Sequence, residues 1–290
     1  MSEVPFDQRD GFIWIDGELH PWKESKVHVL SHGMHYASAV FEGERMYNGK
    51  IFKSREHSER LHKSAEIMGM KIPYSVDEIE KIKYDVCKEN NLTDCYIRVL
   101  AWRGGEQMGV AARKTKTHMA VAAWAWARYF DEDKYKNGIT LRTSPWHRPA
   151  PDTAPTQSKA SGLYMICTMS KHAAEDAGYD DALMLDYQGN VAEGTGANFF
   201  AVKNGTLMTP PPDCFLNGIT RQTVIQIAKD LDIPFEERKI SPDELADIDE
   251  VFLTGTAAEI TAVGQIDDHK FTVGDITNKI RSTYEDLVSS

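Results

Sequence analysis

The sequence predicts a two-domain protein of the α/β class whose helices and strands form α+β layers. Its 290 residues exceed the usual size of one domain, so the length allows two domains or one large α/β domain. Helical and strand-like segments are interspersed without a strict strand, helix, strand succession, which argues against a doubly wound sheet. An acidic stretch predicts a linker at residues 132–140, between an N-terminal domain of residues 1–131 and a C-terminal domain of residues 141–290.

The N-terminal half begins with two tight hairpins. Asp16-Gly17 joins FIWI to ELHPW, and Asn48-Gly49 joins ERMY to KIF. Such pairs are favoured where both central residues of a hairpin turn need positive φ. A helix is predicted to begin near Ser54, and a second begins at Ser75, where Glu78 completes a capping box.

Two strands follow these helices. In CYIRVLAW the side chains alternate, so Tyr96 and Arg98 project from one face of the strand while Cys95 and Ile97 project from the other. HMAVAAWAW is the next strand. One sheet face in the N-terminal half is therefore expected to carry a tyrosine and an arginine.

The C-terminal half contains five predicted strands and three predicted helices. The strands are ITLRTS, DALMLD, ANFFAV, TLMTP and EVFLTG. The helices lie near residues 161–177, 220–231 and 275–288. Ser241 and Glu244 predict a capping box with proline in the first turn.

The charge and the apolar content exclude several functional classes. The formal net charge is -11, and no basic run exceeds two residues, whereas a surface that follows nucleic-acid or lipid phosphates needs clustered Lys and Arg. The N-terminus lacks the pattern of a signal peptide, and no apolar stretch approaches the length of about 18 residues that a membrane span needs. We expect a soluble, cytoplasmic chain that binds neither nucleic acid nor membranes.

Cysteines and histidines give weaker signals. Four cysteines without a CxxC motif are interpreted as reduced core thiols: Cys87, Cys95, Cys167 and Cys214. Three histidines lie close together in the sequence and raise the alternative of a metal site: His28, His32 and His35. No cysteine is near them, and structural histidines around a turn are the preferred interpretation, so no metal is predicted.

Lys159 is the first candidate for chemistry. It stands in PTQSKASGLY among small residues, with no Asp or Glu within five positions. Small flanks leave room for a flat ligand, and a partly desolvated amine loses its proton more readily, as Schiff-base chemistry requires. Tyr164 follows five residues later and is placed to hydrogen-bond such a ligand. The alternative is a surface lysine at a helix start.

Glu193 is the second candidate. In VAEGTGANFF it is followed by two glycines and precedes an apolar strand, so its carboxylate is expected at a sharp turn. A carboxylate paired with a pyridine nitrogen keeps that nitrogen protonated and makes the ring an electron sink. The alternative is a glycine-rich hairpin with an incidental surface glutamate. The segment fits neither a Walker loop nor a dinucleotide fingerprint.

Two segments are candidate anion sites. Gly218 precedes a helix in NGITRQTV, and TGTAAEI, residues 254–260, is a glycine turn with several backbone NH groups. Helix starts of this kind bind anions because unpaired NH donors and the positive end of the helix dipole point outward. Arg60 offers a further bidentate charge, although an exposed helix arginine is its default interpretation.

These segments together carry a resemblance. The chain contains, in order, HVLSHGMHYASAVFEGERMY, EHSERLHKSAEI, YIR with MGV, SKASGLY, EGTGANFF, GITRQTV and FLTGTAAEIT. Across residues 11–264 this series resembles the fold type IV pyridoxal-phosphate enzymes, specifically the bacterial branched-chain amino acid aminotransferases. Each motif is weak alone, but seven in order are specific.

The resemblance implies a role for each residue of a cofactor site, and all of these residues except Arg60 lie in the C-terminal domain. Lys159 would form the Schiff base with pyridoxal 5′-phosphate and move a proton between the substrate Cα and the C4′ carbon of the cofactor. Glu193 would pair with the pyridine nitrogen and Tyr164 with the phenolic oxygen. The residues implied around the phosphate are Arg60, Gly218, Ile219, Thr220, Gly255 and Thr256.

The substrate site is implied in the same way. Tyr96, Arg98 and the segment from Met108 to Val110 match the branched-chain group rather than D-amino acid transaminases or aminodeoxychorismate lyases. Tyr96 and the NH groups near Ala257 and Ala258 would bind the α-carboxylate. Phe41, Trp126 and Tyr129 would surround the side chain, and Arg98 with Tyr36 would bind the second carboxylate of glutamate or 2-oxoglutarate.

The family also implies shared active sites. Tyr36 and Val110 come from the neighbouring subunit in this family, so a homodimer is expected, and some bacterial members form hexamers. The chain departs from the common pattern at Leu163, at Arg128 and at Ala197, which bears on specificity rather than on reaction type.

The expected function is reversible amino transfer between L-leucine, L-isoleucine or L-valine and 2-oxoglutarate by a ping-pong mechanism. One alternative is another fold type IV enzyme that acts on D-amino acids, (R)-amines or aminodeoxychorismate. A second is a scaffold that kept the fold and lost turnover, which the presence of Lys159, Glu193 and Arg60 disfavours. A nucleic-acid platform built on Trp124 and Trp126 is disfavoured by the acidity of the chain.

Overall fold

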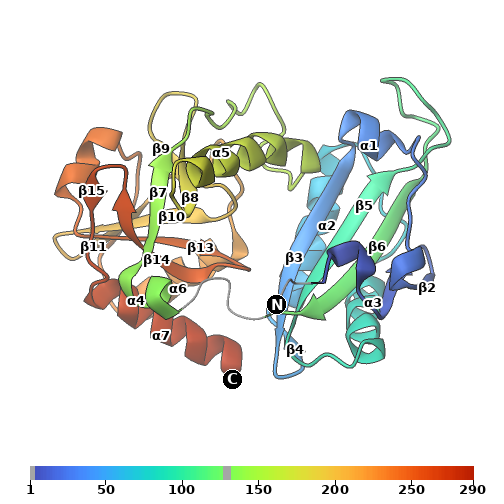
Figure 1. Ribbon diagram of the computed structural model, residues 1–290, viewed down its shortest axis with the longest axis horizontal. Helices are drawn as coiled ribbons and strands as arrows, with labels where there is room; N and C mark the ends of the chain where they lie inside the picture. The colour runs from blue at the N-terminus through green and yellow to red at the C-terminus, as the bar shows by residue number, and fades with distance from the viewer. Residues whose placement is uncertain (1–3, 127–131) are drawn as a thin grey trace. The chain divides into compact units, whose positions relative to one another are not determined.

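The computed structural model describes residues 4–126 and 132–290. These residues form two compact units (Figure 1). The first contains the described residues up to 126 together with the short segment Ser158–Gly162, and the second contains the other described residues. Lys159 therefore belongs to the first unit, although it lies in the second half of the sequence.

The first unit contains a six-stranded antiparallel sheet with the order β2-β1-β6-β5-β3-β4. Its strands are β1 Phe12–Ile15, β2 Glu18–Pro21, β3 Ala39–Tyr47, β4 Lys50–Ile51, β5 Cys95–Arg103 and β6 Thr117–Ala125. Both predicted hairpin turns are confirmed: φ is 48° at Asp16 and 111° at Gly17, and 48° at Asn48 and 80° at Gly49.

Helices α2 and α3 cover one face of this sheet (Figure 1). The helices and short 3₁₀ segments of the unit are η1 Phe6–Gln8, η2 Trp22–Glu24, α1 His32–Tyr36, α2 Ser54–Ile67 and α3 Val76–Glu89. The predicted capping box is present, because the Ser75 side chain accepts from the Glu78 NH and the Glu78 carboxylate accepts from the Ser75 NH. This reciprocal cap satisfies donors that would otherwise lack partners at the start of α3.

The register of β3 and β5 separates two chemically different faces. Gly43 lies opposite Arg98, and Arg45 lies opposite Tyr96, so these side chains share one face, as the alternation in CYIRVLAW predicts. The other face carries Glu42 and Glu44, which are fully buried beneath α2 and α3. The sheet thus has a charged interior face and a face with a tyrosine and an arginine.

The second unit is built on a nine-stranded sheet in its described residues. Its strands are β7 Ile139–Thr143, β8 Asp181–Leu185, β9 Val191–Gly194, β10 Asn198–Lys203, β11 Thr206–Thr209, β12 Phe235–Glu237, β13 Glu250–Gly255, β14 Glu259–Ile266 and β15 His269–Lys270. The five strands predicted in this half are confirmed as β7, β8, β10, β11 and β13. The other four were not predicted.

The sheet of the second unit closes on itself. Strand β9 pairs with β8 and also with β10, so β10, β13, β14, β7, β8 and β9 form a ring. The closing pair is Glu193 and Asn198. The two parallel pairs of the ring are adjacent, β14 with β7 and β7 with β8, and the other pairs are antiparallel. Side chains of these strands belong to a cluster of buried apolar residues.

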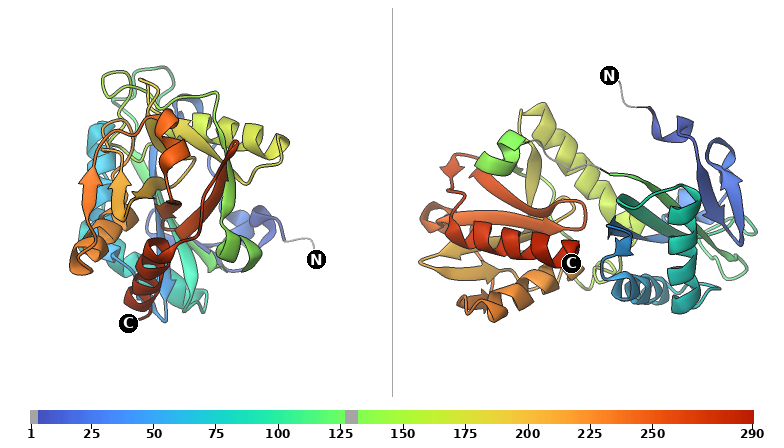
Figure 2. Two further views of the ribbon diagram at one scale, coloured as in Figure 1. Left: turned by 90° about the vertical axis from the view of Figure 1, so that its left-hand side faces the viewer. Right: turned by 90° about the horizontal axis from the view of Figure 1, so that it is seen from below.

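Helices pack around this ring. The helices and 3₁₀ segments of this half are α4 Glu132–Asn137, α5 Met165–Asp176, α6 Ile219–Asp230, η4 Pro242–Asp247 and α7 Asp275–Ser289, and η3 Ser161–Tyr164 spans the boundary between the two units. Helices α6 and α7 contact each other and strand β13 (Figure 2). The second predicted capping box is confirmed at Ser241 and Glu244, at the start of η4. No described helix has the length and apolar content needed to traverse a lipid bilayer.

The stretch expected as a linker is structured. Its first six residues form α4, Glu132–Asn137, and it continues directly into β7. The helix has acidic residues in its first turn and lysines in its last, which complements the helix dipole. Gly138 ends it at φ 82° and donates its NH to the Lys134 carbonyl. Local helix signals in an acidic sequence therefore outweigh its linker-like composition.

Candidate active site

The backbone around Lys159 is held at two sides. The NH of Phe41 in β3 donates to the Lys159 carbonyl over 3.1 Å, and Ala160 forms an antiparallel bridge with Val40. On the other side, the Lys159 NH donates to the Ser64 hydroxyl over 3.0 Å. The segment thus extends the sheet beside β3 and is anchored to α2. The Lys159 Nζ lies 5.0 Å from the centroid of the Phe41 ring.

Arg60 lies one helical turn before Ser64 on α2 and forms a fork with Glu42. Its Nε donates to Oε1 of Glu42 over 2.7 Å and its Nη2 to Oε2 over 2.8 Å. His57 contacts the same carboxylate, with Nδ1 at 2.6 Å from Oε2. Burial alone would raise the pKa of Glu42, but the charges and hydrogen bonds of Arg60 and His57 hold it well below its ordinary value.

The predicted substrate residues Tyr96, Arg98 and Phe41 lie together on the opposite face of the sheet from Glu42. Nη2 of Arg98 donates to the Tyr96 hydroxyl over 3.1 Å, and the Arg98 guanidinium lies 4.6 Å from the Phe41 ring centroid. The Tyr96 ring centroid is 5.1 Å from those of Trp124 and Trp126. This side of the first unit therefore combines a guanidinium and a hydroxyl with aromatic walls.

Tyr36 and Val110 lie on exposed parts of the first unit. Tyr36 ends α1, with its ring 4.5 Å from that of His32, and Val110 lies between β5 and β6 and is 83% exposed. Met34 and Met108 nearby in the sequence are also exposed. Tyr129, which was predicted to line the same pocket, lies outside the described residues, as does Arg128.

Glu193 lies where β9 meets β10 in the second unit, and Asn198 holds it there. Nδ2 of Asn198 donates to Oε2 of Glu193 over 3.1 Å and to the carbonyl of Leu216 over 3.0 Å, while its Oδ1 accepts from the NH of Gly218 over 3.1 Å. Asn198 thereby links the predicted carboxylate to the predicted anion-binding helix. It was not recognised in the sequence, because an asparagine at a strand start carries no distinctive signal.

Arg148 is a second residue that the sequence did not reveal. It is buried, its Nε lies 3.3 Å from Oε1 of Glu193, and its Nη1 donates to the Leu163 carbonyl over 3.4 Å. Burial would lower the pKa of Arg148, but the charges of Glu193, Cys167 and Tyr164 together outweigh burial and raise it. Arg148 therefore stays charged beside Glu193 and places positive potential at Tyr164.

The two predicted anion segments meet near Asn198. Helix α6 begins at Ile219 with Gly218 as its N-cap, as predicted, and Thr220 is buried in its first turn. A Cβ atom on Gly218 would lie 2.2 Å from the Asn198 Oδ1, so only glycine allows this approach. Asn198 also pairs with Thr254 in β13, whose hairpin turn contains Thr256. Three of the predicted cofactor segments therefore contact one asparagine.

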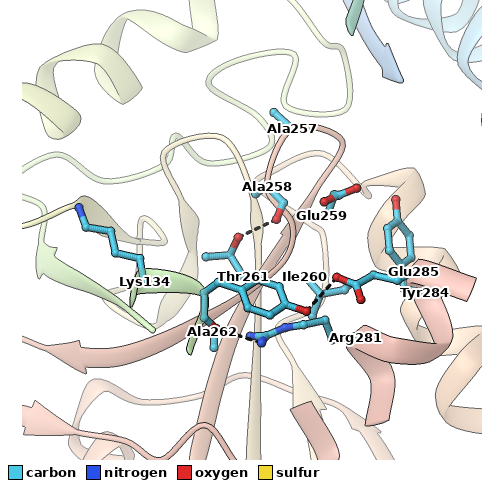
Figure 3. Close-up of a pocket in the computed structure, with 11 residues that line it drawn as sticks. Lys134, Ala257, Ala258, Glu259, Ile260, Thr261, Ala262, Arg281, Tyr284 and Glu285 are labelled. Atoms are coloured by element: carbon cyan, nitrogen blue, oxygen red, sulfur yellow. Dashed lines mark hydrogen bonds between the residues drawn. The ribbon is translucent and has the colours of Figure 1, made fainter. Parts of the chain in front are cut away.

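The turn between β13 and β14 carries Ala257 and Ala258. Gly255 pairs with Glu259 at its base, and the Thr261 hydroxyl donates to the Ala258 carbonyl over 2.6 Å (Figure 3). The pocket in Figure 3, a cavity of about 30 Å³, lies against this turn and is also lined by Tyr135 and Arg281. Such a volume holds one or two water molecules, so this is a supported turn rather than a ligand cavity.

The predicted histidines and cysteines have structural surroundings. His32 is buried between the Ser38 hydroxyl and the Gly109 carbonyl, and His35 contacts the Val29 carbonyl. All four cysteines are buried, and burial raises the pKa of Cys167 to about 11 and that of Cys214 to about 12. These two thiols therefore remain protonated at neutral pH.

The predicted residues thus form two groups, one in each unit. The first unit presents an amine and two guanidinium groups: Lys159, Arg60 and Arg98. The second unit presents a buried carboxylate, a phenol and backbone NH donors at Glu193, Tyr164, Gly218–Thr220 and the turn after Gly255. In the first unit Lys159 and Arg98 both lie near the Phe41 ring, whereas Arg60 pairs with Glu42 on the other face of the sheet. In the second unit Asn198 links Glu193 to Gly218. The groups that orient the predicted residues, Glu42, Arg148 and Asn198, are the ones that sequence reasoning missed.

Comparison with known proteins identifies consistent relatives. Residues 39–266 match the family model described as Amino-transferase class IV. The chain is 43% identical to a probable branched-chain-amino-acid aminotransferase of Rickettsia felis, over 99% of each chain. It is 42% identical to the branched-chain-amino-acid aminotransferase of Pseudomonas aeruginosa, over 97% of this chain and 94% of the relative.

Solved structures agree with these relatives. The crystal structure of the Escherichia coli branched-chain amino acid aminotransferase has a TM-score of 0.93 at 39% identity, covering 97% of this chain and 95% of that one. The T.th. branched-chain amino acid aminotransferase with pyridoxamine 5′-phosphate has a TM-score of 0.94 at 39% identity, with the same coverage. The predicted fold class, a two-domain fold type IV architecture, is confirmed by these likenesses.

Proposed function

The chain belongs to the class IV aminotransferase family, and we propose that it transfers amino groups reversibly between L-leucine, L-isoleucine or L-valine and 2-oxoglutarate, using pyridoxal 5′-phosphate. The observation that carries the proposal is the position of the Lys159 segment. Strand β3 and helix α2 hold its backbone from two sides, beside the cluster of Phe41, Tyr96 and Arg98. The similarity of the chain, over nearly its full length, to enzymes named for this activity supports the same proposal.

The residues present suit this cofactor. It needs an amine for its aldehyde, an acid for its ring nitrogen and an anion site for its phosphate, and it supplies an electron sink when bound. Glu193 offers a carboxylate that two neighbours orient, and the start of α6 offers NH donors of a 12-residue helix. The structural relative with pyridoxamine 5′-phosphate and another with N-(5′-phosphopyridoxyl)-L-glutamate support the same group.

The chain's own residues then divide the work. Lys159 would hold the cofactor through Nζ at the aldehyde carbon, with release of water, and would move the proton of the substrate Cα. Glu193 would hold a proton on the ring nitrogen, and Tyr164 would donate to the phenolic oxygen of the cofactor. The phosphate would be held by Arg60, Thr220, Thr256 and the NH groups of the first turn of α6. Glycine at positions 218 and 255 would allow its close approach.

The substrate site is proposed on the aromatic face of the first unit. Phe41 and Trp126, with Tyr129, would contact the branched side chain. Arg98 and the partner subunit's Tyr36 would bind the second carboxylate of glutamate. The Tyr96 hydroxyl and the NH groups of Ala257 and Ala258 would bind the α-carboxylate. One pocket can serve both substrates because the guanidinium of Arg98 is already paired with a tyrosine hydroxyl and an aromatic ring.

A homodimer with shared active sites is part of the proposal. Apolar side chains near α1 and in the segment between β5 and β6 are exposed, among them Val29 at 65%, Met34 at 64%, Met108 at 43% and Val110 at 83%. Burying such side chains against a second copy is favourable, and Tyr36 and Val110 would then serve the partner's site. Mass measurement in solution distinguishes a dimer from a hexamer. The proposed location is the cytoplasm.

The test is a spectrum followed by a half-reaction. The purified protein should show the visible absorption band of bound pyridoxal phosphate, and L-leucine should bleach it. A band that responds to D-alanine but not to L-leucine would favour a D-amino acid transaminase. A protein without the band would contradict the proposed function. Borohydride reduction with peptide mapping should place the label on Lys159.

A further inference from the structure

The arginine proposed for the phosphate has an unusual environment for a helix arginine. Arg55, on the same helix, is 53% exposed in its side chain and pairs with Asp77 at the surface. The side chain of Arg60 is 16% exposed, and its partner Glu42 is 0% exposed. A carboxylate buried to this degree is costly unless its charge is paired and hydrogen-bonded. The burial of the Glu42 carboxylate therefore depends on its pairing with the Arg60 guanidinium.

The geometry of the pair fixes the plane of the guanidinium. Glu42 accepts from Nε and Nη2 through separate oxygens, at 2.7 and 2.8 Å, which is the bidentate arrangement of a planar fork. His57, one turn earlier on α2, contacts Oε2 at 2.6 Å and limits rotation of the carboxylate. The carboxylate is held by β3, so a sheet residue determines where a helix arginine points.

Glu42 also lies next to the Lys159 segment. Its neighbour in β3, Phe41, donates its NH to the Lys159 carbonyl over 3.1 Å, and Ser64, one turn after Arg60, accepts the Lys159 NH over 3.0 Å. The same strand and the same helix therefore position the lysine and the arginine. A shift of either side chain relative to the other would separate the two points at which one ligand is held.

We propose that Glu42 is a positioning residue that orients Arg60 for the cofactor phosphate, an inference that rests on the proposed function. Glu42 touches neither substrate nor cofactor and acts through the guanidinium. The negative charge of Glu42 and its orientation of Arg60 have opposite effects on the affinity for an anion. Removing the negative charge at Glu42 would by itself strengthen phosphate binding, whereas releasing the fork weakens it. The sign of the change therefore separates positioning from simple electrostatics.

The test uses Glu42→Gln in the holoenzyme. We expect pyridoxal phosphate to leave the protein at least tenfold faster, measured as loss of the visible band after transfer into phosphate-free buffer. The amide directs an NH₂ group at Arg60 or His57 and breaks the fork. Glu42→Asp, which keeps the charge but shortens the side chain, should also release the cofactor faster. Unchanged or slower release in both variants would overturn the proposal.

Glu44→Gln is the matched control. Glu44 lies two residues along β3 on the same face, is equally buried, and accepts from Lys83 over 2.7 Å rather than from Arg60. We expect it to lower the melting temperature but to leave cofactor release within twofold of the wild type. Equal acceleration by Glu42→Gln and Glu44→Gln would mean general destabilisation and would contradict the inference.

Two further measurements test whether the effect of Glu42 acts through phosphate binding. The affinity ratio between pyridoxal phosphate and pyridoxal should fall at least tenfold in Glu42→Gln, because pyridoxal lacks the group that Arg60 binds. Inorganic phosphate should raise the melting temperature of the wild type more than that of the variant. If the wild type has no cofactor band but shows this difference, the proposed function fails, while the orientation of Arg60 toward a phosphate by Glu42 is supported. If phosphate stabilises both proteins equally, the inference fails.

Discussion

A Cβ atom on Gly43 would lie 1.9 Å from the hydroxyl oxygen of Tyr96 and 2.8 Å from its Cζ. Because Gly43 in β3 has no side chain, the Tyr96 ring can lie across it. In this position the Tyr96 hydroxyl accepts a hydrogen bond from Arg98 over 3.1 Å. Sheet residues without side chains often mark such close approaches. The pairing of the tyrosine with the arginine depends on a glycine in the neighbouring strand.

Gly43→Ala is therefore expected to displace Tyr96. Overpacking of this kind costs about 1–3 kcal/mol, and the KM for glutamate and for 2-oxoglutarate should rise roughly tenfold as Arg98 loses its partner. Denaturant unfolding and steady-state kinetics measure the two effects. In the double variant with Tyr96→Phe, part of the lost stability should return because the clashing hydroxyl is gone; strictly additive losses would contradict this reading.

Lys159→Ala is expected to abolish amino transfer while leaving a folded protein. The backbone hydrogen bonds to Phe41 and Ser64 do not involve the Lys159 side chain, so the segment should keep its place. Circular dichroism and solution mass check the fold, and a leucine and 2-oxoglutarate assay checks the activity. Retained amino transfer would show that another residue provides the amine.

Arg98→Ala is expected to discriminate between substrates. A hydrogen bond to a charged group contributes about 1.5–3 kcal/mol, so kcat/KM should fall by roughly 10- to 100-fold more with glutamate than with leucine. The comparison of the two half-reactions, followed by the absorption of the cofactor, gives the ratio directly. Equal losses with both amino acids would argue against a carboxylate contact at Arg98.

Asn198→Ala should weaken the second unit at its closing strand pair. The change removes contacts to Glu193, Leu216 and Gly218, and unsatisfied buried groups cost about 1–3 kcal/mol each, so the free energy of unfolding should fall by a few kcal/mol. Asn190→Ala serves as a control, since that side chain donates to Asp186 within a single turn. Denaturant midpoints compare the two, and a similar small loss in both would contradict a closing role.

The loop before β6 should respond to pH through His118. His118 contacts Asp16 at 2.5 Å and Glu106 at 3.1 Å. Burial would lower its pKa, but hydrogen bonds to the two carboxylates and their charges raise it above 6.5. A raised folded-state pKa contributes stability that is complete below about 6.5 and is lost as pH rises through the folded value.

Glu106, a carboxylate partner of His118, sets the lower end of the pH range in which this pairing stabilises the fold. The pKa of Glu106 is lowered despite the opposing effect of burial, because backbone NH groups and His118 stabilise its charge, so its contribution is lost as pH falls below about 4.5. Between about pH 4.5 and 6.5 both contributions are present. We expect His118→Gln to lower the melting temperature more at pH 6 than at pH 8. A difference independent of pH would count against the pairing.

Features governed by neighbouring residues were predictable from the sequence. Asp16-Gly17 and Asn48-Gly49 specify their turns through φ preferences of the residues themselves, and the capping box joins Ser75 to Glu78 within one helical turn. The small flanks of Lys159 and the glycine before α6 are equally local. Local composition did not predict the helix at residues 132–137, where acidic character indicated a linker and the chain forms α4.

Features that depend on distant segments required the folded chain. Ser64 and Lys159 are 95 positions apart in the sequence, yet they share a hydrogen bond, and Glu42 reaches Arg60 across the gap between a strand and a helix. No periodicity or motif encodes such pairs, because a buried charge selects its partner by proximity after the layers have packed. The candidate reactive residues could be named from local motifs. The groups that contact them, Glu42, Arg148 and Asn198, became evident only in the folded chain, where β3, β9 and β10 lie against their neighbours.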